Sequence, residues 1–203
     1  MTGRTLIEAV ADGLCDGGVG VVTNFPGFHS HEIAAQTRRS RTFRSERLAF
    51  CFAWGVAFAG VRAACVLKNV GLNDAADAYV NAAALDINAG FVTVVLDDVL
   101  GEASQLLQDS RPYQLMGPAL WTEPASVADA YAQARSAFEL SEKLKTPVVL
   151  RLTNSLLGAR GKYERQLRPD RDTNPVRRAP DRFCVHPFWV EAQQLRLAKR
   201  QKA

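Results

Sequence analysis

The residues in this sequence that are best suited to chemistry are a glutamate and two histidines. Glu46, in the run Ser45-Glu46-Arg47, opens the long apolar segment 48–59, and His29 and His31 follow a Pro-Gly turn. A carboxyl group in a dry site and an imidazole can both exchange a proton near neutral pH. A loop can aim either histidine inward, so these side chains could exchange protons with a bound ligand.

Each of these residues also has a simpler interpretation. The helix dipole favours an acidic residue in the first turn, which would explain Glu46 without any catalytic role. His29 could be a polar residue at the start of a helix, and His31 could be solvated.

The elements that must position these residues predict an α/β fold. Apolar runs rich in β-branched residues alternate with helical patterns, as in a parallel sheet with helices on both faces. We expect strands at 19–23, 42–43, 63–67, 91–96, 118–121 and 147–152, and helices at 5–17, 30–37, 46–59, 73–87 and 126–144. Ligands bind beyond the carboxyl ends of such strands, so the site is expected in the loops at 24–31, 45–46, 68–73 and 97–113.

Composition favours one large domain, over residues 1–160, followed by a basic connector and tail over residues 161–203. From Ala159 onward there are twelve Lys and Arg and five Asp and Glu, a net charge of +7, whereas the rest of the chain carries −3. The tail is interrupted by apolar residues and no nucleic-acid motif accompanies it, so we expect it to pack on a partner protein.

Several classes of protein and site are disfavoured. No apolar run is long enough to span a bilayer, and the first residues lead into an amphipathic helix and do not form a signal peptide. The four scattered cysteines, Cys15, Cys51, Cys65 and Cys184, form no Cys-x-x-Cys pair. We therefore expect no metal site in this chain, and buried thiols in a cytoplasmic protein that binds neither membranes nor nucleic acid.

Glycine-rich phosphate loops are absent, which excludes the commonest nucleotide-binding α/β folds. The sequence instead resembles the pyrimidine-binding domain of thiamine diphosphate (ThDP) enzymes, and in particular the alpha subunit of indolepyruvate:ferredoxin oxidoreductase. The resemblance runs from about Thr5 to Gly161. The segments that carry it are 20–27 (Gly-Val-Val-Thr-Asn-Phe-Pro-Gly), 45–47, 59–63, 68–73, 108–111, 123–124 and 137–143.

The resemblance implies roles for particular residues. In the family a glutamate contacts N1′ of the aminopyrimidine and promotes deprotonation of the thiazolium C2, which then attacks a 2-oxo acid. By its position in the motif Glu46 is that glutamate, and His29 and His31 are the further catalytic candidates. The residues expected to border the cofactor are Pro26, Gly27, Glu46, Lys68, Asn69 and Asn73. Those expected to contact the substrate are Phe28, His29 and Arg111.

Arg111 and the asparagines have alternatives. Arg111 matches a family arginine near the substrate carboxylate, a group that a guanidinium can hold by two bonds. It could equally form a surface salt bridge with Asp109. Lys68, Asn69 and Asn73 could serve only the chemistry of a turn and a helix start.

Two departures from the family pattern concern its partners. The diphosphate and magnesium motif, Gly-Asp-Gly followed by Asn, is missing, which implies that a separate diphosphate-binding subunit holds Mg²⁺ in an α2β2 assembly. The cysteine clusters of ferredoxin-type electron transfer are missing too.

We therefore expect a pyrimidine-binding subunit of a split ThDP enzyme that decarboxylates an aromatic 2-oxo acid. His29 and His31 stand where the oxidoreductases carry a small hydroxyl residue. This favours a non-oxidative fate, in which the enamine is protonated or coupled to a carbonyl acceptor. The alternatives are a subunit of a 2-oxo acid:ferredoxin oxidoreductase and a non-catalytic regulatory subunit.

Overall fold

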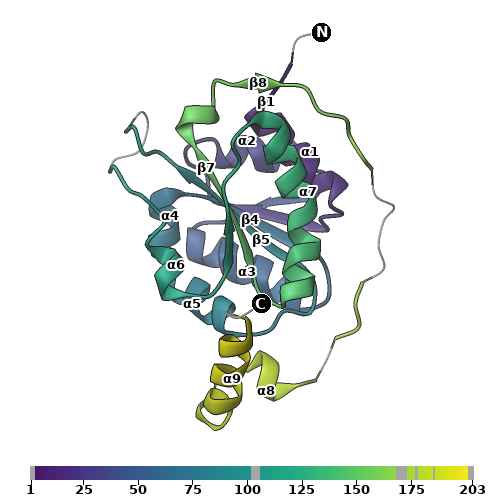
Figure 1. Ribbon diagram of the computed structural model, residues 1–203, viewed down its shortest axis with the longest axis vertical. Coiled ribbons are helices and arrows are strands. Elements are labelled where there is room, and N and C mark those ends of the chain that lie inside the picture. Colours follow the sequence, from purple (N-terminus) through teal and green to yellow (C-terminus); the bar gives the residue numbers. More distant parts are fainter. Residues whose placement is uncertain (1–2, 102–105, 168–172, 177, 185, 201–203) are drawn as a thin grey trace.

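A computed structural model describes residues 3–101, 106–167, 173–176, 178–184 and 186–200 of the chain (Figure 1). Its centre is a six-stranded sheet in the order β3-β2-β4-β5-β7-β6, in which every neighbouring pair is parallel. The strands are β2 (Val21–Asn24), β3 (Ser40–Thr42), β4 (Ala63–Lys68), β5 (Phe91–Asp97), β6 (Leu120–Thr122) and β7 (Val148–Thr153). The predicted parallel α/β fold is confirmed.

Helices cover both faces of the sheet, and each face has its own apolar core (Figure 1). One face packs against α1 (Leu6–Asp16), α2 (Ser30–Ala35) and α7 (Val127–Leu144). The other packs against α3 (Glu46–Phe58), α4 (Asn69–Asp74) and α5 (Ala76–Ala84), and the short helix α6 (Tyr113–Met116) precedes β6.

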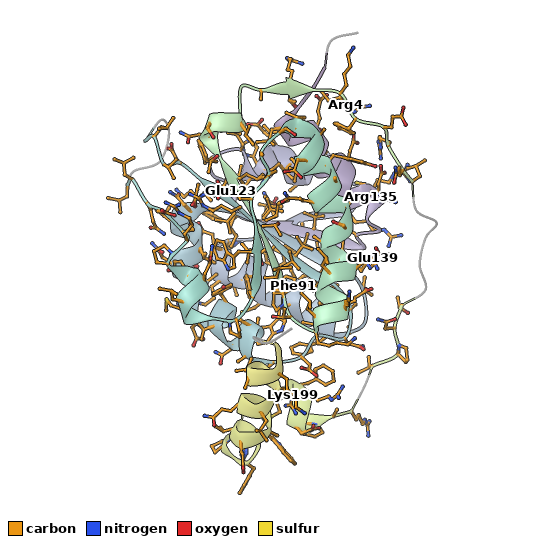
Figure 2. All side chains as sticks on the ribbon, viewed as in Figure 1. Arg4, Phe91, Glu123, Arg135, Glu139 and Lys199 are labelled. Carbon is orange, nitrogen blue, oxygen red and sulfur yellow. The ribbon has the colours of Figure 1, made fainter. Side chains whose placement is uncertain are left out.

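The central strands are mostly apolar because both of their faces are buried. All seven residues of β5 are buried, and Phe91, at its start, lies in the interior of the molecule (Figure 2). Local signals set the helix starts: Thr5 and Glu8 form a capping box at α1, and the Ser126 hydroxyl accepts from the Asp129 N–H at α7.

Two expectations about local structure were wrong. The segment 68–73 is not a loop followed by one long helix: α4 begins at Asn69, and Ala75 separates it from α5. The side chain of Asn69 accepts from the Val70 N–H, which satisfies an early donor of that helix. The cysteines are not all buried, because Cys51 and Cys184 are exposed and Cys15 is half-buried.

Residues outside the main sheet form two further groups of elements. The short strands β1 (Arg4–Thr5) and β8 (Arg160–Gly161) pair antiparallel, and Tyr163 and Arg165 bind Asp12 and Asp16 on α1. Further on come α8 (Pro180–Phe183), the 3₁₀ turn η2 (Pro187–Trp189) and α9 (Val190–Arg200). Helix α9, on which Lys199 is labelled in Figure 2, extends away from the main sheet.

Among the described residues, no helix has both the length and the apolar character needed to cross a bilayer. The same part of the chain holds no group of three or more His, Cys, Asp or Glu side chains that could bind a metal ion.

Candidate active site

The sheet changes its winding direction between β2 and β4. From β2 the chain passes over α2 to the edge strand β3, and it returns through α3 on the opposite face to β4. The loops after β2 and β4 therefore diverge at neighbouring carboxyl ends, which is where open α/β sheets form their ligand sites.

The loop after β2 is folded tightly around Ser30. The Ser30 hydroxyl donates to the Phe25 carbonyl at 2.6 Å and accepts from the Gly27 N–H at 3.1 Å. A Cβ added at Gly27 would lie 3.0 Å from Cδ of Lys68. The loop after β2 thus touches the end of β4, and the structure brings the predicted residues Gly27 and Lys68 together.

Phe28 and His29 in this loop both have a left-handed backbone, with φ of 34° and 61°. This conformation is uncommon for residues other than glycine, and it concentrates at functional sites. His29 Nδ1 lies 2.7 Å from Glu32 Oε1, whereas the Phe28 ring packs on the apolar core. His31 is exposed on α2. The two histidines therefore differ in environment, and His29 is the one held by a carboxylate.

Glu46 is the first residue of α3, and three contacts fix that end of the helix. The Ser45 hydroxyl accepts from the Leu48 N–H, and the Asp74 carboxylate accepts from the Arg47 N–H at 2.9 Å. Buried Thr23 on β2 donates to the Ala49 carbonyl at 2.8 Å. These contacts attach the start of α3 to both β2 and α4.

The side chain of Glu46 lies against α4. A Cβ added at Gly71 would fall 2.6 Å from Glu46 Cγ and 2.7 Å from Oε1, so a glycine at position 71 leaves the space that this side chain needs. Glu46 is half-buried, and within the described part of the chain its carboxylate makes no hydrogen bond or ion pair. A partly desolvated carboxylate without a partner is suited to binding a ligand that donates a hydrogen bond.

Asn69 and Asn73 bind the loop that follows β5. The amides of Asn73 and Gln108 exchange two hydrogen bonds, at 2.8 and 2.9 Å, and the Tyr113 hydroxyl donates to Asn73 at 2.7 Å. The Asn69 amide donates to the Gln108 carbonyl. Asn69 and Asn73 lie on α4 with Gly71, so the loop after β5 is tied to the helix that Glu46 contacts.

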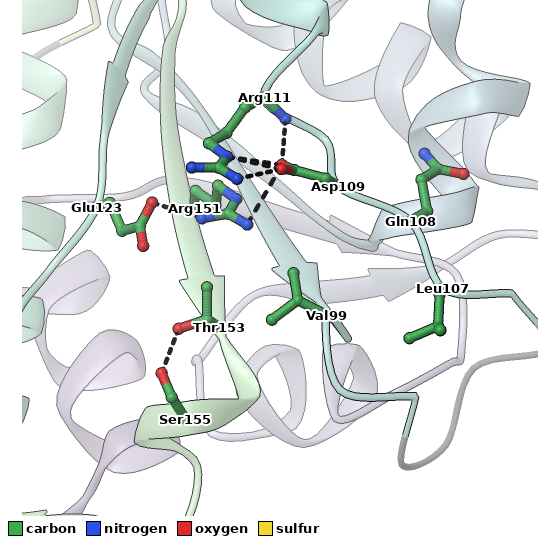
Figure 3. Close-up of a pocket in the computed structure, with 9 residues that line it drawn as sticks. All are labelled: Val99, Leu107, Gln108, Asp109, Arg111, Glu123, Arg151, Thr153 and Ser155. Atoms are coloured by element: carbon green, nitrogen blue, oxygen red, sulfur yellow. Dashed lines mark hydrogen bonds and ion pairs between the residues drawn. The ribbon is translucent and has the colours of Figure 1, made fainter.

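A cleft of about 590 Å³ opens at the carboxyl ends of β5 and β7 (Figure 3). Arg111 lies at this cleft and binds Asp109 with its backbone N–H and its guanidinium. This pairing is the alternative noted for Arg111, and its hydrogen bonds lower the pKa of Asp109 to about 2. The Arg111 side chain remains 62% exposed.

Arg151 lies at the centre of the ion pairs around this cleft, and the sequence did not predict a role for it. It is buried on β7 and binds Asp97 on β5 and Glu123, each at 2.5 Å, and Asp109 at 3.4 Å. Asp97 also accepts from the backbone and hydroxyl of Ser110. The sequence carried one indication of this network, because Arg151 is a charged residue inside the otherwise mostly apolar strand Val148–Thr153.

No protein-family model matches the chain. Three curated relatives are indolepyruvate oxidoreductase subunits IorA. The one from Thermococcus kodakarensis is 35% identical over 162 residues, which cover 76% of this chain and 25% of the relative. The Archaeoglobus fulgidus subunit is 34% identical over 194 residues, which cover 89% of this chain and 31% of that relative. The Methanothermobacter marburgensis subunit is 31% identical over 207 residues, which cover 96% of this chain and 33% of that relative. The chain thus spans a quarter to a third of these relatives' length.

Two solved structures share the fold. A 2-oxoglutarate:ferredoxin oxidoreductase from Magnetococcus marinus aligns with a TM-score of 0.67 at 17% identity, over 76% of this chain and 29% of that one. A thiamine diphosphate-dependent 4-hydroxybenzoylformate decarboxylase from Rhodococcus jostii RHA1 aligns with a TM-score of 0.62 at 19% identity. The alignment covers 77% of this chain and 31% of the decarboxylase chain. At these identities the likeness concerns the fold alone. The chain is therefore similar in sequence to part of the IorA subunits, and it shares its α/β fold with part of a 2-oxo acid:ferredoxin oxidoreductase and part of a thiamine diphosphate-dependent decarboxylase.

Proposed function

We propose that the chain is the pyrimidine-binding part of a ThDP-dependent 2-oxo acid oxidoreductase of the indolepyruvate type. The observation that carries this proposal is Glu46: a half-buried carboxylate without a partner in the described chain, beside Gly71, at the point where the sheet reverses its winding. The similarity to IorA subunits at 31–35% identity supports the oxidoreductase chemistry.

The residues around Glu46 fit an aminopyrimidine. ThDP, when bound, supplies the carbon nucleophile that attacks the 2-oxo group and accepts the electrons left after carbon dioxide departs. Glu46 would hold the proton at N1′ of the pyrimidine ring. Pro26, Gly27, Lys68, Asn69 and Asn73 would border that ring, with the asparagines acting through the loop that they bind.

Phe28, His29 and Arg111 would face the substrate. A substrate carboxylate would have to share the Arg111 guanidinium with Asp109, which already occupies two of its nitrogens. Because that guanidinium is mostly exposed, its remaining N–H groups can still receive a second acid.

The proposal includes partners that this chain does not supply. Mg²⁺ and the diphosphate would be held by a diphosphate-binding part in an α2β2 assembly. Electrons would leave for ferredoxin through iron–sulfur subunits, and the complex would work in the cytoplasm. The expected non-oxidative decarboxylation and carboligation have less support, because the relatives are named oxidoreductases.

Electron-acceptor dependence distinguishes the two chemistries. The assembled enzyme, given indolepyruvate and coenzyme A, is expected to turn over when oxidised methyl viologen or ferredoxin is present, and to stop without an acceptor. Reduced viologen and carbon dioxide should appear together. Catalytic release of carbon dioxide without any acceptor, with an aldehyde or acyloin as the product, would instead establish the non-oxidative reaction.

A small change beside Glu46 probes the same proposal. Gly71→Ala is expected to lower turnover by roughly 10–100-fold, because the added methyl group must displace the Glu46 side chain from its place. Alanine is itself favoured in a helix by about 1 kcal/mol, so the fold should survive. The matched control is Gly158→Ala, whose methyl would meet nothing within 4 Å. Steady-state kinetics of both variants would show whether the loss is specific to position 71.

A further inference from the structure

Helix α9 turns its polar side toward the rest of the protein. Arg196 is at the centre of this inner side, and its guanidinium lies 3.4 Å from the Asp181 carboxylate and 4.0 Å from the buried carboxylate of Asp86. On the same side, the Gln193 amide donates to the Cys184 carbonyl at 2.7 Å. The polar groups of α9 are therefore used to hold the helix in its place.

The apolar side of α9 faces solvent, together with the turn that precedes the helix. A helix in a soluble protein normally buries its apolar stripe against the core. Here Leu195 is 60% exposed, and Phe188 in the preceding turn is 85% exposed. The exposed residues of the helix recur every three or four positions along one side: Val190, Glu191, Gln194, Leu195, Ala198 and Lys199. Contiguous exposed apolar side chains usually mark a surface that binds another molecule.

Helix α9 lies at the end of the molecule away from the candidate active site (Figure 1). Helix α8, which precedes it, is attached at Asp86, whose N–H donates to the Arg182 carbonyl at 3.0 Å. The rings of Phe183 and Phe58 also pack edge to face, 5.5 Å apart. Asp86 comes just before β5, at the amino ends of the parallel strands, whereas Glu46 lies toward their carboxyl ends. A protein bound to α9 would therefore leave the candidate active site open.

Two opposite charges stand at equal distances from the middle of the exposed side of α9. Glu191 and Lys199 are each four residues from Leu195, and neither forms an ion pair with a described residue. In an antiparallel pair of α9 helices with a two-fold axis at Leu195, each Glu191 would face Lys199 of the other copy. The two Leu195 side chains would meet at the centre. A parallel pair would instead bring like charges together.

We propose that α9 pairs antiparallel with α9 of a second copy of this chain, with Leu195 at the two-fold axis and a Glu191–Lys199 ion pair on either side of it. The inference goes beyond the proposed function, and nothing in it depends on ThDP chemistry. It gives the basic tail, expected to pack on a partner protein, a definite partner. Lipid and nucleic-acid surfaces fit less well, because Arg196 is already engaged inside the chain and Glu191 would face their anionic groups.

The pair should be weak and dependent on concentration when the full chain is studied alone. One contact between two helices of 11 residues buries less than the roughly 1,200–2,000 Å² of standard interfaces. We therefore expect a dissociation constant on the order of micromolar. Sedimentation velocity between about 1 and 200 µM, a range that brackets such a constant, would measure it. A monomer at every concentration would overturn the proposal.

A charge placed at the axis tests the centre of the pair. Leu195→Glu should raise the dissociation constant at least about tenfold, because it puts two carboxylates against each other in the contact. The matched control is Leu115→Glu, the same change at a leucine that is 92% exposed on α6, and it should alter the constant less than about twofold. Equal effects of the two variants, or no effect of Leu195→Glu, would contradict the pairing.

Exchanging the charges tests the antiparallel register. Glu191→Lys and Lys199→Glu each place like charges opposite one another at both ends of the pair, and each should weaken association by about tenfold. The double variant restores opposite charges and should associate within about threefold of the wild type. Because it opposes the helix dipole at both ends, this recovery cannot come from a more stable helix. A double variant as weak as either single one would refute the register.

A disulfide identifies what covers α9 in the native complex, purified with its bound partners from the source organism. Leu195→Cys, in a chain whose exposed Cys51 and Cys184 are replaced by serine, should link two copies on mild oxidation, because a residue at the axis lies opposite itself. Leu115→Cys in the same background should form no link. If the thiol introduced on α9 is protected from labelling reagents but links no second copy, another partner covers the helix and the proposal is wrong.

Failure of this pairing and failure of the proposed function can be told apart. The tests of α9 measure association and cross-linking, whereas the test of Glu46 measures turnover. If the α9 variants associate as the wild type does, the pairing is wrong and the proposed function stands. If Glu46→Gln is fully active, the proposed function is wrong and the pairing is unaffected.

Discussion

Glu46→Gln is expected to lower turnover of the assembled enzyme by roughly 10²–10⁴-fold, the usual contribution of a positioned acid or base. The amide is nearly isosteric with the carboxyl group, so the contacts that fix the start of α3, from Ser45, Asp74 and Thr23, should remain. What the amide lacks is the ability to exchange a proton with N1′ of the pyrimidine.

Turnover with viologen as acceptor, measured together with complex size by light scattering, would check this prediction. Glu164→Gln, a change at an exposed residue beyond β8, serves as the matched control and should leave turnover unchanged. Near wild-type activity of the Glu46 variant would also favour the third possibility, a regulatory chain with a degenerate site.

Arg151→Met is expected to lower the free energy of unfolding of the chain by about 3–5 kcal/mol, the typical cost of removing one partner of a buried ion pair. Asp97, with no exposed surface, would lose its charged partner and keep only the two bonds from Ser110. Glu123 should suffer less, because its side chain is 48% exposed and can be solvated by water.

Urea denaturation would measure this loss, and two variants act as controls. Arg111→Met removes an exposed partner of the same cluster and should cost less than about 1 kcal/mol. Adding Asp97→Asn to Arg151→Met removes the uncompensated charge and should recover part of the stability. If Arg151→Met costs no more than Arg111→Met, the buried cluster is not what holds the loop after β5 in place.

Much of the fold could be predicted from the sequence because its signals are local. Mostly apolar strands such as Phe91–Asp97 are typical of a sheet with both faces covered, and their alternation with helices implied parallel order. The start of α3 could also be predicted from local sequence, because the Ser45 cap and the acidic Glu46 both act within the first turn of the helix. The glutamate could thus be named before its surroundings were known.

Other features depended on contacts between distant segments. Nothing local places Gly71 against Glu46, pairs Asn73 with Gln108, or joins Arg151 on β7 to Asp97 on β5. The break between α4 and α5 was missed for a similar reason, because the alanine-rich segment has no strong local stop signal.

The sequence by itself determined the fold class, the helix that begins at Glu46 and the residue types available for chemistry. The tertiary structure decided which of those residues meet, that Arg111 is held by Asp109, and that the Glu46 carboxylate has no partner among the described residues. The physical reason is range: capping and periodicity act over a few residues along the chain, whereas burial and ion pairing depend on neighbours brought together from strands far apart in sequence.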